Sequence, residues 1–264
     1  MRVLILGGTM EARQLAERLA KRSDLVVTLS LAGRTTAPAL QPVPVRVGGF
    51  GGAQGLADYL LDQKIDVLID ATHPYAATIS TNAAAAAPQA RVALLALRRP
   101  GWTPIMGDRW IEVGDVAGAV QALGNTSRHV FLALGRKEIE PFADAPQHSY
   151  LVRSVEAVVP PLNVPHAVYI TGRGPFAVAD ERALLEQHRI EVVVAKNSGG
   201  AATYGKIAAA RALSLPVILL RRPLPPPHPP PQAGEGGEGA AVETVDDAVA
   251  WLDHASACAA ARGV

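Results

Sequence analysis

The 264-residue sequence contains a single cysteine, Cys258. One cysteine allows no disulfide within the chain and no cluster of thiolate metal ligands. We therefore expect no bound metal and a reducing, cytoplasmic environment. An excess of charge of one sign is also missing, since 25 lysines and arginines face 24 aspartates and glutamates. No overall positive field is available to bind nucleic acid non-specifically.

Long apolar runs are absent as well. No stretch of about 18 apolar residues occurs, which argues against a membrane span. The apolar start at 3–6 is interrupted by glycine too soon to resemble a signal peptide. Hydrophobic residues nevertheless make up 49% of the chain and charged residues 19%. This composition is typical of a folded chain with substantial cores.

Short apolar runs alternate with helical patterns along the first hundred residues. The predicted strands are 3–6, 26–31, 43–47, 65–69 and 92–97. The predicted helices are 10–21, one around 56–61, and one that begins with Pro74 as its first residue and runs to Ala87. Such alternation predicts a mostly parallel sheet with helices on both faces.

The alternation restarts beyond residue 110, so the chain is predicted to be an α/β protein with a second unit of similar size. Its predicted strands are 130–134, 150–153, 167–170, 192–195 and 217–220. One predicted helix begins after Asp115, which is its N-cap, and two others cover about 179–188 and 203–213. The Pro- and Gly-rich segment after residue 222 cannot bury a core and is predicted to be a flexible linker.

These patterns give five segments. They are a cofactor domain (1–98), an interdomain crossing (99–110), a substrate domain (111–222), a linker (223–241) and a closing helix (242–264).

The turn after the first strand, Gly7-Gly8-Thr9, is the first candidate ligand site. Glycine gives a turn backbone freedom, and the helix N-terminus that follows offers unpaired N–H groups to a phosphate. Open α/β sheets bind ligands at the carboxyl ends of their strands. We therefore predict that this turn, together with Glu11, cradles a dinucleotide; a tight turn without a ligand is the alternative.

Arg34 and Thr35 follow the second strand, where an NAD site usually carries Asp or Glu for the ribose hydroxyl. A guanidinium can instead pair with a 2′-phosphate. This position favours NADPH over NADH, and a solvated surface arginine is the alternative.

Two further loops end strands of the first unit. Gly49 and Phe50 lie in a run with four glycines in five residues, which allows close approach of a ligand to the backbone. Thr72, His73, Pro74 and Tyr75 follow the fourth strand. We assign Thr72, His73 and Pro74 to the cofactor site, because Thr72 and His73 could hydrogen-bond to nicotinamide or substrate. His73 and Tyr75 are the candidates for catalysis, and Tyr75 could stack on the substrate or donate a proton to it. A purely structural histidine is the alternative for His73.

Three loops that follow strands of the second unit gather cations, hydroxyls and glycines. Cations and hydroxyls at one sheet edge predict an acidic ligand rich in carboxylates or phosphates. Three unrelated solvated loops are the alternative. The predicted substrate-binding residues here are Arg136, Lys137, Arg173, Lys196, Asn197, Ser198, Gly199, Gly200, Thr203 and Lys206.

Four motifs together resemble the precorrin-6A reductase family of cobalamin biosynthesis. They are Leu-Gly-Gly-Thr-x-Glu-Ala at 6–12, Asp-Ala-Thr-His-Pro-Tyr-Ala at 70–76, Arg-Pro-x-Trp at 99–102, and Lys-Asn-Ser-Gly-Gly-x-x-Thr-x-x-Lys at 196–206. The resemblance extends from residue 1 to about 223. Ala96 and Arg98 stand where family members often carry a further charged pair.

The resemblance implies two Rossmann-like domains, with NADPH on the first and the active site in the cleft between them. It implies hydride reduction of one double bond of precorrin-6A to give precorrin-6B, and it adds Arg99 to the substrate-binding residues. The partner is then a tetrapyrrole substrate, not nucleic acid or a membrane. We expect a monomer, with at most transient contact with neighbouring pathway enzymes.

Other functions remain open at this point. Another NADP-dependent oxidoreductase of a small polyanion is one, although the Tyr-x-x-x-Lys pair of many such enzymes is missing: Ile79 stands four residues after Tyr75. A non-catalytic NADP- or tetrapyrrole-binding module would share the cradle. A methyltransferase is disfavoured by Arg34, because an acidic residue is expected for the ribose of its cofactor.

Overall fold

The structure, a computed structural model, describes residues 1–33, 40–224 and 240–262. The chain divides into two compact units: residues 1–100 with 223–264 form the first, and residues 101–222 form the second. Each is built on a six-stranded sheet in which every pairing is parallel. The α/β class with two Rossmann-like units is thus confirmed. None of the helices in the described part of the chain is long and apolar enough to cross a membrane.

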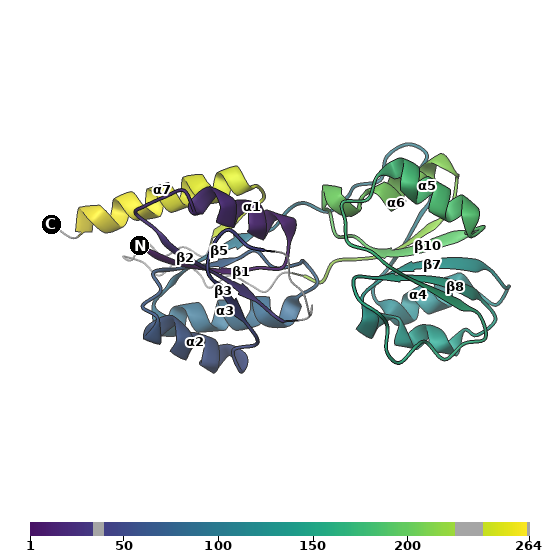
Figure 1. The fold of residues 1–264 in the computed structure, drawn as a ribbon, viewed down its shortest axis with the longest axis horizontal. Helices are drawn as coiled ribbons and strands as arrows, with labels where there is room; N and C mark the ends of the chain where they lie inside the picture. Colours follow the sequence, from purple (N-terminus) through teal and green to yellow (C-terminus); the bar gives the residue numbers. More distant parts are fainter. Residues whose placement is uncertain (34–39, 225–239, 263–264) are drawn as a thin grey trace. The chain divides into compact units, whose positions relative to one another are not determined.

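The first unit has the strand order β12-β5-β4-β1-β2-β3. Its strands are β1 (Arg2–Leu6), β2 (Val26–Leu31), β3 (Val45–Val47), β4 (Val67–Asp70), β5 (Ala93–Leu97) and β12 (Ala240–Val242). Its helices are α1 (Met10–Leu19), α2 (Gly52–Asp62), α3 (Ala77–Ala90) and α7 (Val245–Arg262). The helices α1 and α7 cover one face, and α2 and α3 cover the other (Figure 1).

Alternate residues of β1 feed the two cores of this unit. Val3 and Ile5 face α1 and α7, whereas Leu4 and Leu6 face α2 and α3, and all four are buried. A strand that is buried on both sides has no polar face. This explains why an uninterrupted apolar run at 3–6 predicts a central parallel strand.

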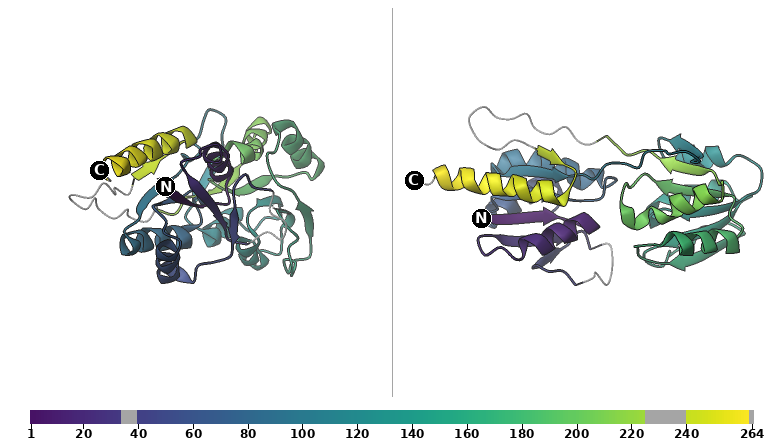
Figure 2. Two further views of the ribbon diagram at one scale, coloured as in Figure 1. Left: turned by 60° about the vertical axis from the view of Figure 1, so that its left-hand side comes forward. Right: turned by 90° about the horizontal axis from the view of Figure 1, so that it is seen from above.

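The segment after residue 239 returns to complete this sheet. β12 pairs with β5, and α7 buries Ala248 and Leu252 in the core that α1 also covers. In every view α7, drawn in yellow, lies along one face of this unit (Figure 2). The linker predicted at 223–241 is wrong for residues 240 and 241, which belong to β12.

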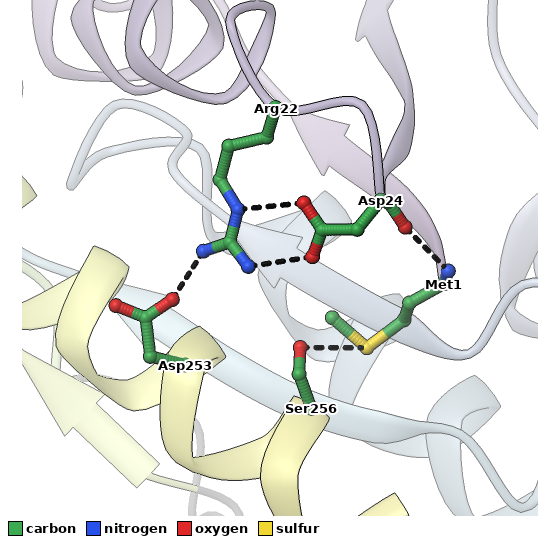
Figure 3. Close-up of polar contacts among 5 residues, drawn as sticks. All are labelled: Met1, Arg22, Asp24, Asp253 and Ser256. Atoms are coloured by element: carbon green, nitrogen blue, oxygen red, sulfur yellow. Dashed lines mark hydrogen bonds and ion pairs between the residues drawn. The ribbon is translucent and has the colours of Figure 1, made fainter. Parts of the chain in front are cut away.

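Polar contacts also fix α7 to Met1 and to the segment between α1 and β2 (Figure 3). Arg22 bridges Asp24 and Asp253, which lies on α7. The Met1 ammonium donates to the Asp24 carbonyl oxygen at 2.9 Å, and the Ser256 hydroxyl lies 3.8 Å from the Met1 sulfur. These contacts and the buried leucine make α7 an integral part of the first unit.

The second unit has the strand order β6-β11-β10-β7-β8-β9. The strands are β6 (Trp110–Val113), β7 (His129–Ala133), β8 (Ser149–Ser154), β9 (Ala167–Thr171), β10 (Val192–Lys196) and β11 (Val217–Leu220). The helices are α4 (Val116–Leu123), α5 (Val178–Gln187) and α6 (Gly205–Ala212), with short 3-10 turns η1 (Arg136–Glu138), η2 (Glu140–Asp144) and η3 (Ala201–Thr203). The helices α5 and α6 pack together on one face, with α4 on the other (Figure 1).

Several predicted boundaries differ from the structure. Asp115 is confirmed as an N-cap, since its carboxylate accepts from the Gly118 N–H at 2.8 Å. Pro74 does not begin a helix: it lies in a turn, and α3 starts three residues later. The strand predicted at 43–47 is confined to β3, and Trp110, assigned to the interdomain crossing, begins β6.

Candidate functional site

The turn after β1 combines one packed glycine with one open glycine. The Gly7 N–H donates to the Ser30 carbonyl at 2.9 Å, and a Cβ at Gly7 would lie 2.6 Å from Leu29 Cδ1. Gly8 has φ +115°, a conformation that side chains rarely adopt, and a Cβ there would meet nothing within 4 Å. Gly7 therefore allows the turn to pack on β2, while Gly8 leaves open space beside the start of α1.

Thr9 joins two turns at the carboxyl edge of the sheet. Its hydroxyl accepts from the Ala12 N–H at 3.1 Å, which caps α1, and donates to the Ala71 carbonyl at 2.8 Å. Ala71 directly follows β4, the neighbour of β1 in the sheet. One side chain therefore fixes the helix N-terminus against the Thr72-His73 turn.

The buried carboxylate of Asp70 organises that second turn. Its Oδ1 accepts from the Thr72 hydroxyl at 2.6 Å and from the Thr72 N–H at 3.1 Å. Its Oδ2 lies 3.3 Å from Nη2 of Arg98, at the end of β5. The Thr72 hydroxyl also lies 3.4 Å from Ser80 Oγ on α3. Asp70 thus connects Thr72 to a cation on the neighbouring strand.

A small recess opens at this edge of the first unit, with about 10 Å³ of space for water, which is room for about one water molecule. Glu11, on the first turn of α1, forms an ion pair there with Arg99, and both side chains are largely buried. Because a typical small-molecule site occupies roughly 300–1,000 Å³, the recess is at most one corner of such a site. Its lining residues are Thr9, Glu11, Thr72, Pro74, Leu97, Arg98 and Arg99.

His73 and Tyr75 lie beside one another in the turn after β4. The Tyr75 N–H donates to His73 Nδ1 at 3.3 Å, and the two ring centroids are 5.6 Å apart. A neutral imidazole whose Nδ1 accepts a hydrogen bond carries its proton on Nε2. In this neutral form, His73 can therefore donate a hydrogen bond from Nε2–H.

The glycine-rich loop after β3 is braced from within. Arg46 donates to the carbonyl oxygens of Gly48 and Gly49 at 2.5 and 2.7 Å. Its guanidinium also lies 3.7 Å from the centroid of the Phe50 ring, which packs edge-on against Tyr59. Phe50 is therefore engaged with Arg46 and Tyr59, whereas a Cβ at Gly49 would meet only open space.

Arg34 and Thr35, the residues predicted to contact the ribose phosphate, lie outside the described residues.

The predicted cations of the second unit differ in their surroundings. Lys196 forms an ion pair with Glu138 of η1. Arg136 lies 3.6 Å from a Glu156 carboxylate oxygen and donates to the Ala157 carbonyl at 3.5 Å. Arg173 is exposed. The side chain of Lys137 is outside the described part of the chain.

The side-chain amide of Asn197 binds both backbone groups of Trp102. Its Oδ1 accepts from the Trp102 N–H at 2.7 Å, and its Nδ2 donates to the Trp102 carbonyl at 2.9 Å. Ser198 is buried, and its hydroxyl lies 2.9 Å from the Thr203 hydroxyl. Gly199 has φ +71°, and Gly200 precedes η3. The geometry gives Asn197 a role in holding Trp102, where sequence analysis predicted a substrate contact.

Lys206 is also placed differently from the prediction. It is 5% exposed, and its ammonium donates to the Thr203 carbonyl at 2.6 Å. A buried ion pair lies near it: Arg153 binds Glu181, with Nη2 and Oε2 2.9 Å apart. A direct contact between the Lys206 ammonium and a substrate carboxylate does not fit this burial.

The structure therefore brings together Thr9, Glu11, Thr72, Pro74 and Arg99 at one recess, with Gly8, Gly49 and His73 at the same edge of the sheet. Sequence analysis gave no role to Asp70, Arg98 or Arg46. Of these three, only Asp70 could be recognised from its neighbours in the sequence, because an aspartate commonly accepts a hydrogen bond from the backbone N–H of the residue two positions later. A helix N-terminus beside hydroxyls and open glycines is suited to an anionic cofactor.

Comparisons with known proteins agree on one family. The family described as "Precorrin-6x reductase CbiJ/CobK" matches residues 2–253. A Sinorhizobium protein named precorrin-6A reductase is 59% identical over 224 residues, which cover 85% of this chain and 86% of the relative. A Rhodococcus erythropolis protein of the same name is 46% identical over 256 residues, covering 95% and 97%. A solved structure named "CobK precorrin-6A reductase" superposes with a TM-score of 0.89 at 45% identity, covering 96% of each chain.

Proposed function

The chain belongs to the precorrin-6x reductase CbiJ/CobK family, and from this membership we propose that it reduces one double bond of precorrin-6A with NADPH, giving precorrin-6B. It is an oxidoreductase with a Rossmann-like fold. The main support for the proposed cofactor site is the Thr9–Ala71 hydrogen bond, because this bond holds the capped N-terminus of α1 beside the Thr72-His73 turn.

The residues at the carboxyl edge of the first sheet fit a nicotinamide dinucleotide. Gly8, Gly48, Gly49 and Gly51 leave open space where a side chain would stand, and the first turn of α1 presents N–H groups beside Gly8. When bound, NADPH supplies the hydride. The chain's own contribution is to bind and orient: Thr9 holds the start of α1, and Asp70 holds the Thr72 turn that carries His73.

The preference for the phosphorylated cofactor rests on Arg34. We expect tighter binding of NADPH than NADH, and loss of that preference in Arg34→Ala, because the Arg34 guanidinium is the cation expected to pair with the 2′-phosphate. Fluorescence titration with both nucleotides measures it. Equal affinities of the unaltered protein for the two nucleotides would count against this assignment.

The second unit supports the substrate half of the proposal through its cations. Precorrin-6A carries many carboxylates. Arg173 is a cation that follows β9, and Lys196 is a cation at the last position of β10. We expect Arg173→Ala and Lys196→Ala to weaken substrate binding without changing NADPH affinity. Arg182→Ala is the matched control, since Arg182 is an exposed arginine on α5 paired with Glu186. Loss of NADPH binding in Arg173→Ala or Lys196→Ala would contradict the division of roles.

The decisive experiment is anaerobic incubation of the protein with precorrin-6A and NADPH. We expect a change in the substrate's absorbance and transfer of deuterium from C4-deuterated NADPH to the product. His73→Gln and Tyr75→Phe test the two candidate proton donors, each by a loss of kcat. NADPH affinity should stay unchanged in Tyr75→Phe and fall in His73→Gln, because His73 is also assigned to the cofactor site. Binding of both ligands without any spectral change would favour a non-catalytic binding module. A cytoplasmic location and a monomeric state stay predictions.

A further inference from the structure

Lys206 is a buried lysine at the start of α6, and it contacts the loop that leads into that helix. Its ammonium donates to the Thr203 carbonyl at 2.6 Å, at the end of η3. It also lies 5.2 Å from the ring centroid of Trp102, within the range of a cation–π interaction. Only 5% of the residue is exposed. A lysine is rarely buried to this extent unless its charge is paired.

The surroundings of Lys206 oppose its charge. Burial is the main cause that lowers the pKa of Lys206 to about 7, and the Arg153 cation on β8 lowers it further. The Glu181 carboxylate on α5 acts in the opposite direction, but it is already bound to Arg153. The other cation on α6, Arg211, forms an ion pair with Asp108 at 3.8 Å. Lys206 therefore changes its protonation state close to neutral pH.

Both contacts of Lys206 lead to one loop, residues 196–203. Thr203 ends this loop and hydrogen-bonds back to Ser198 within it. Trp102 is held by Asn197 of the same loop through both of its backbone groups. Thr203 and Trp102 are thus connected to each other twice, once through the loop and once through Lys206.

We propose that Lys206 is a positioning residue that acts as a proton-dependent switch: its ammonium form holds the loop 196–203 and Trp102 in the arrangement that binds the substrate. This rests on the proposed function, because the loop's ligand is the polycarboxylate proposed above. The ammonium makes a charge-assisted hydrogen bond to Thr203 and attracts the Trp102 ring. The neutral amine keeps only a weaker hydrogen bond, so loss of the proton loosens the loop.

The first test uses Trp102 as an optical reporter and needs no substrate. The sequence has three tryptophans, so Trp110→Phe and Trp251→Phe together leave Trp102 alone. We expect its fluorescence to change on titration with a midpoint near pH 7, the pKa that the surroundings of Lys206 produce. Adding Lys206→Met should abolish that transition, whereas adding Lys21→Met, which alters an exposed lysine, should not. A transition that survives Lys206→Met overturns the proposal.

The second test separates substrate binding from turnover. For the unaltered enzyme we expect KM for precorrin-6A to rise about threefold as pH increases across neutrality, at nearly constant kcat. Lys206→Met should show the high KM at every pH, and Lys206→Arg, if it folds, should lose the rise because arginine stays charged. A wild-type KM in Lys206→Met, or an effect confined to kcat or NADPH affinity, overturns the proposal. A protein that reduced no precorrin-6A would leave the Trp102 titration to decide the switch alone.

Discussion

Replacing Asp70 by asparagine tests how strongly the turn after β4 is held. Asparagine keeps an oxygen that can accept from Thr72, but it turns an N–H₂ group towards the Arg98 guanidinium and removes the ion pair. The Asp70 side chain is 4% exposed and that of Arg98 is 23%, with 3.3 Å between the charged atoms. Exposed pairs contribute about 0–1 kcal/mol, and breaking a buried pair costs about 3–5 kcal/mol. This intermediate case should lose about 2 kcal/mol of unfolding free energy.

Calorimetry is the measurement, because the two compact units can unfold in separate transitions. A loss of about 2 kcal/mol should lower the transition temperature of the first unit by roughly 8 °C and leave that of the second unit unchanged. Asp66→Asn is the matched control: Asp66 is an exposed carboxylate just before β4 that accepts from the Arg2 N–H at 2.6 Å. If Asp70→Asn shifts the first transition no more than Asp66→Asn does, the buried ion pair does not hold this turn.

Three further predictions follow from burial and close packing. Gly7→Ala should cost about 1–3 kcal/mol in the first unit, because its Cβ would lie 2.6 Å from Leu29 Cδ1, and chemical denaturation will show whether β2 adapts without loss. Leu252→Ala should cost about 3 kcal/mol in the same unit, far more than Asp253→Ala at an exposed ion pair; equal losses would mean that α7 does not share the core. Burial lowers the pKa of His148 in the folded protein, so as the pH falls this histidine takes up a proton in the unfolded chain before it does so in the folded one. The unfolding free energy of the second unit should therefore fall by up to about 1.4 kcal/mol per pH unit below about pH 6.5. His148→Phe should remove that pH dependence, as measured by denaturation at about pH 7.5 and 5.5.

The fold class could be predicted because buried parallel strands have a simple pattern. Runs such as Val3–Leu6 and Val192–Ala195 are apolar on both faces, and few other local structures produce them between helical periods. β6 and β12 lack that pattern. β12 contains two alanines and a valine, so it is a strand because β5 offers a free edge, and only tertiary pairing decides this.

The candidate site could be predicted where local chemistry determines it, and not where distant residues do. Thr9 could be predicted because it belongs to a glycine turn between an apolar strand and a helical pattern, which is readable from its neighbours. The partner of Arg99 was not, since Glu11 lies 88 residues away along the chain. Asn197 and Trp102 are 95 residues apart, and a conspicuous amide on a glycine-rich loop gives no sign that it binds a tryptophan backbone.

The return of the chain to β12 and α7 has a consequence for biosynthesis. The second unit is one continuous segment, whereas the first needs residues on both sides of it. At roughly 5–20 residues per second, a ribosome needs about 7–30 s to proceed from the end of β5 to β12. During that interval the edge of β5 is unpaired, and the core surface that Leu252 will cover is open. The second unit can therefore complete its fold on the nascent chain first, and the first unit is the one exposed to chaperones and to mispairing until α7 has emerged.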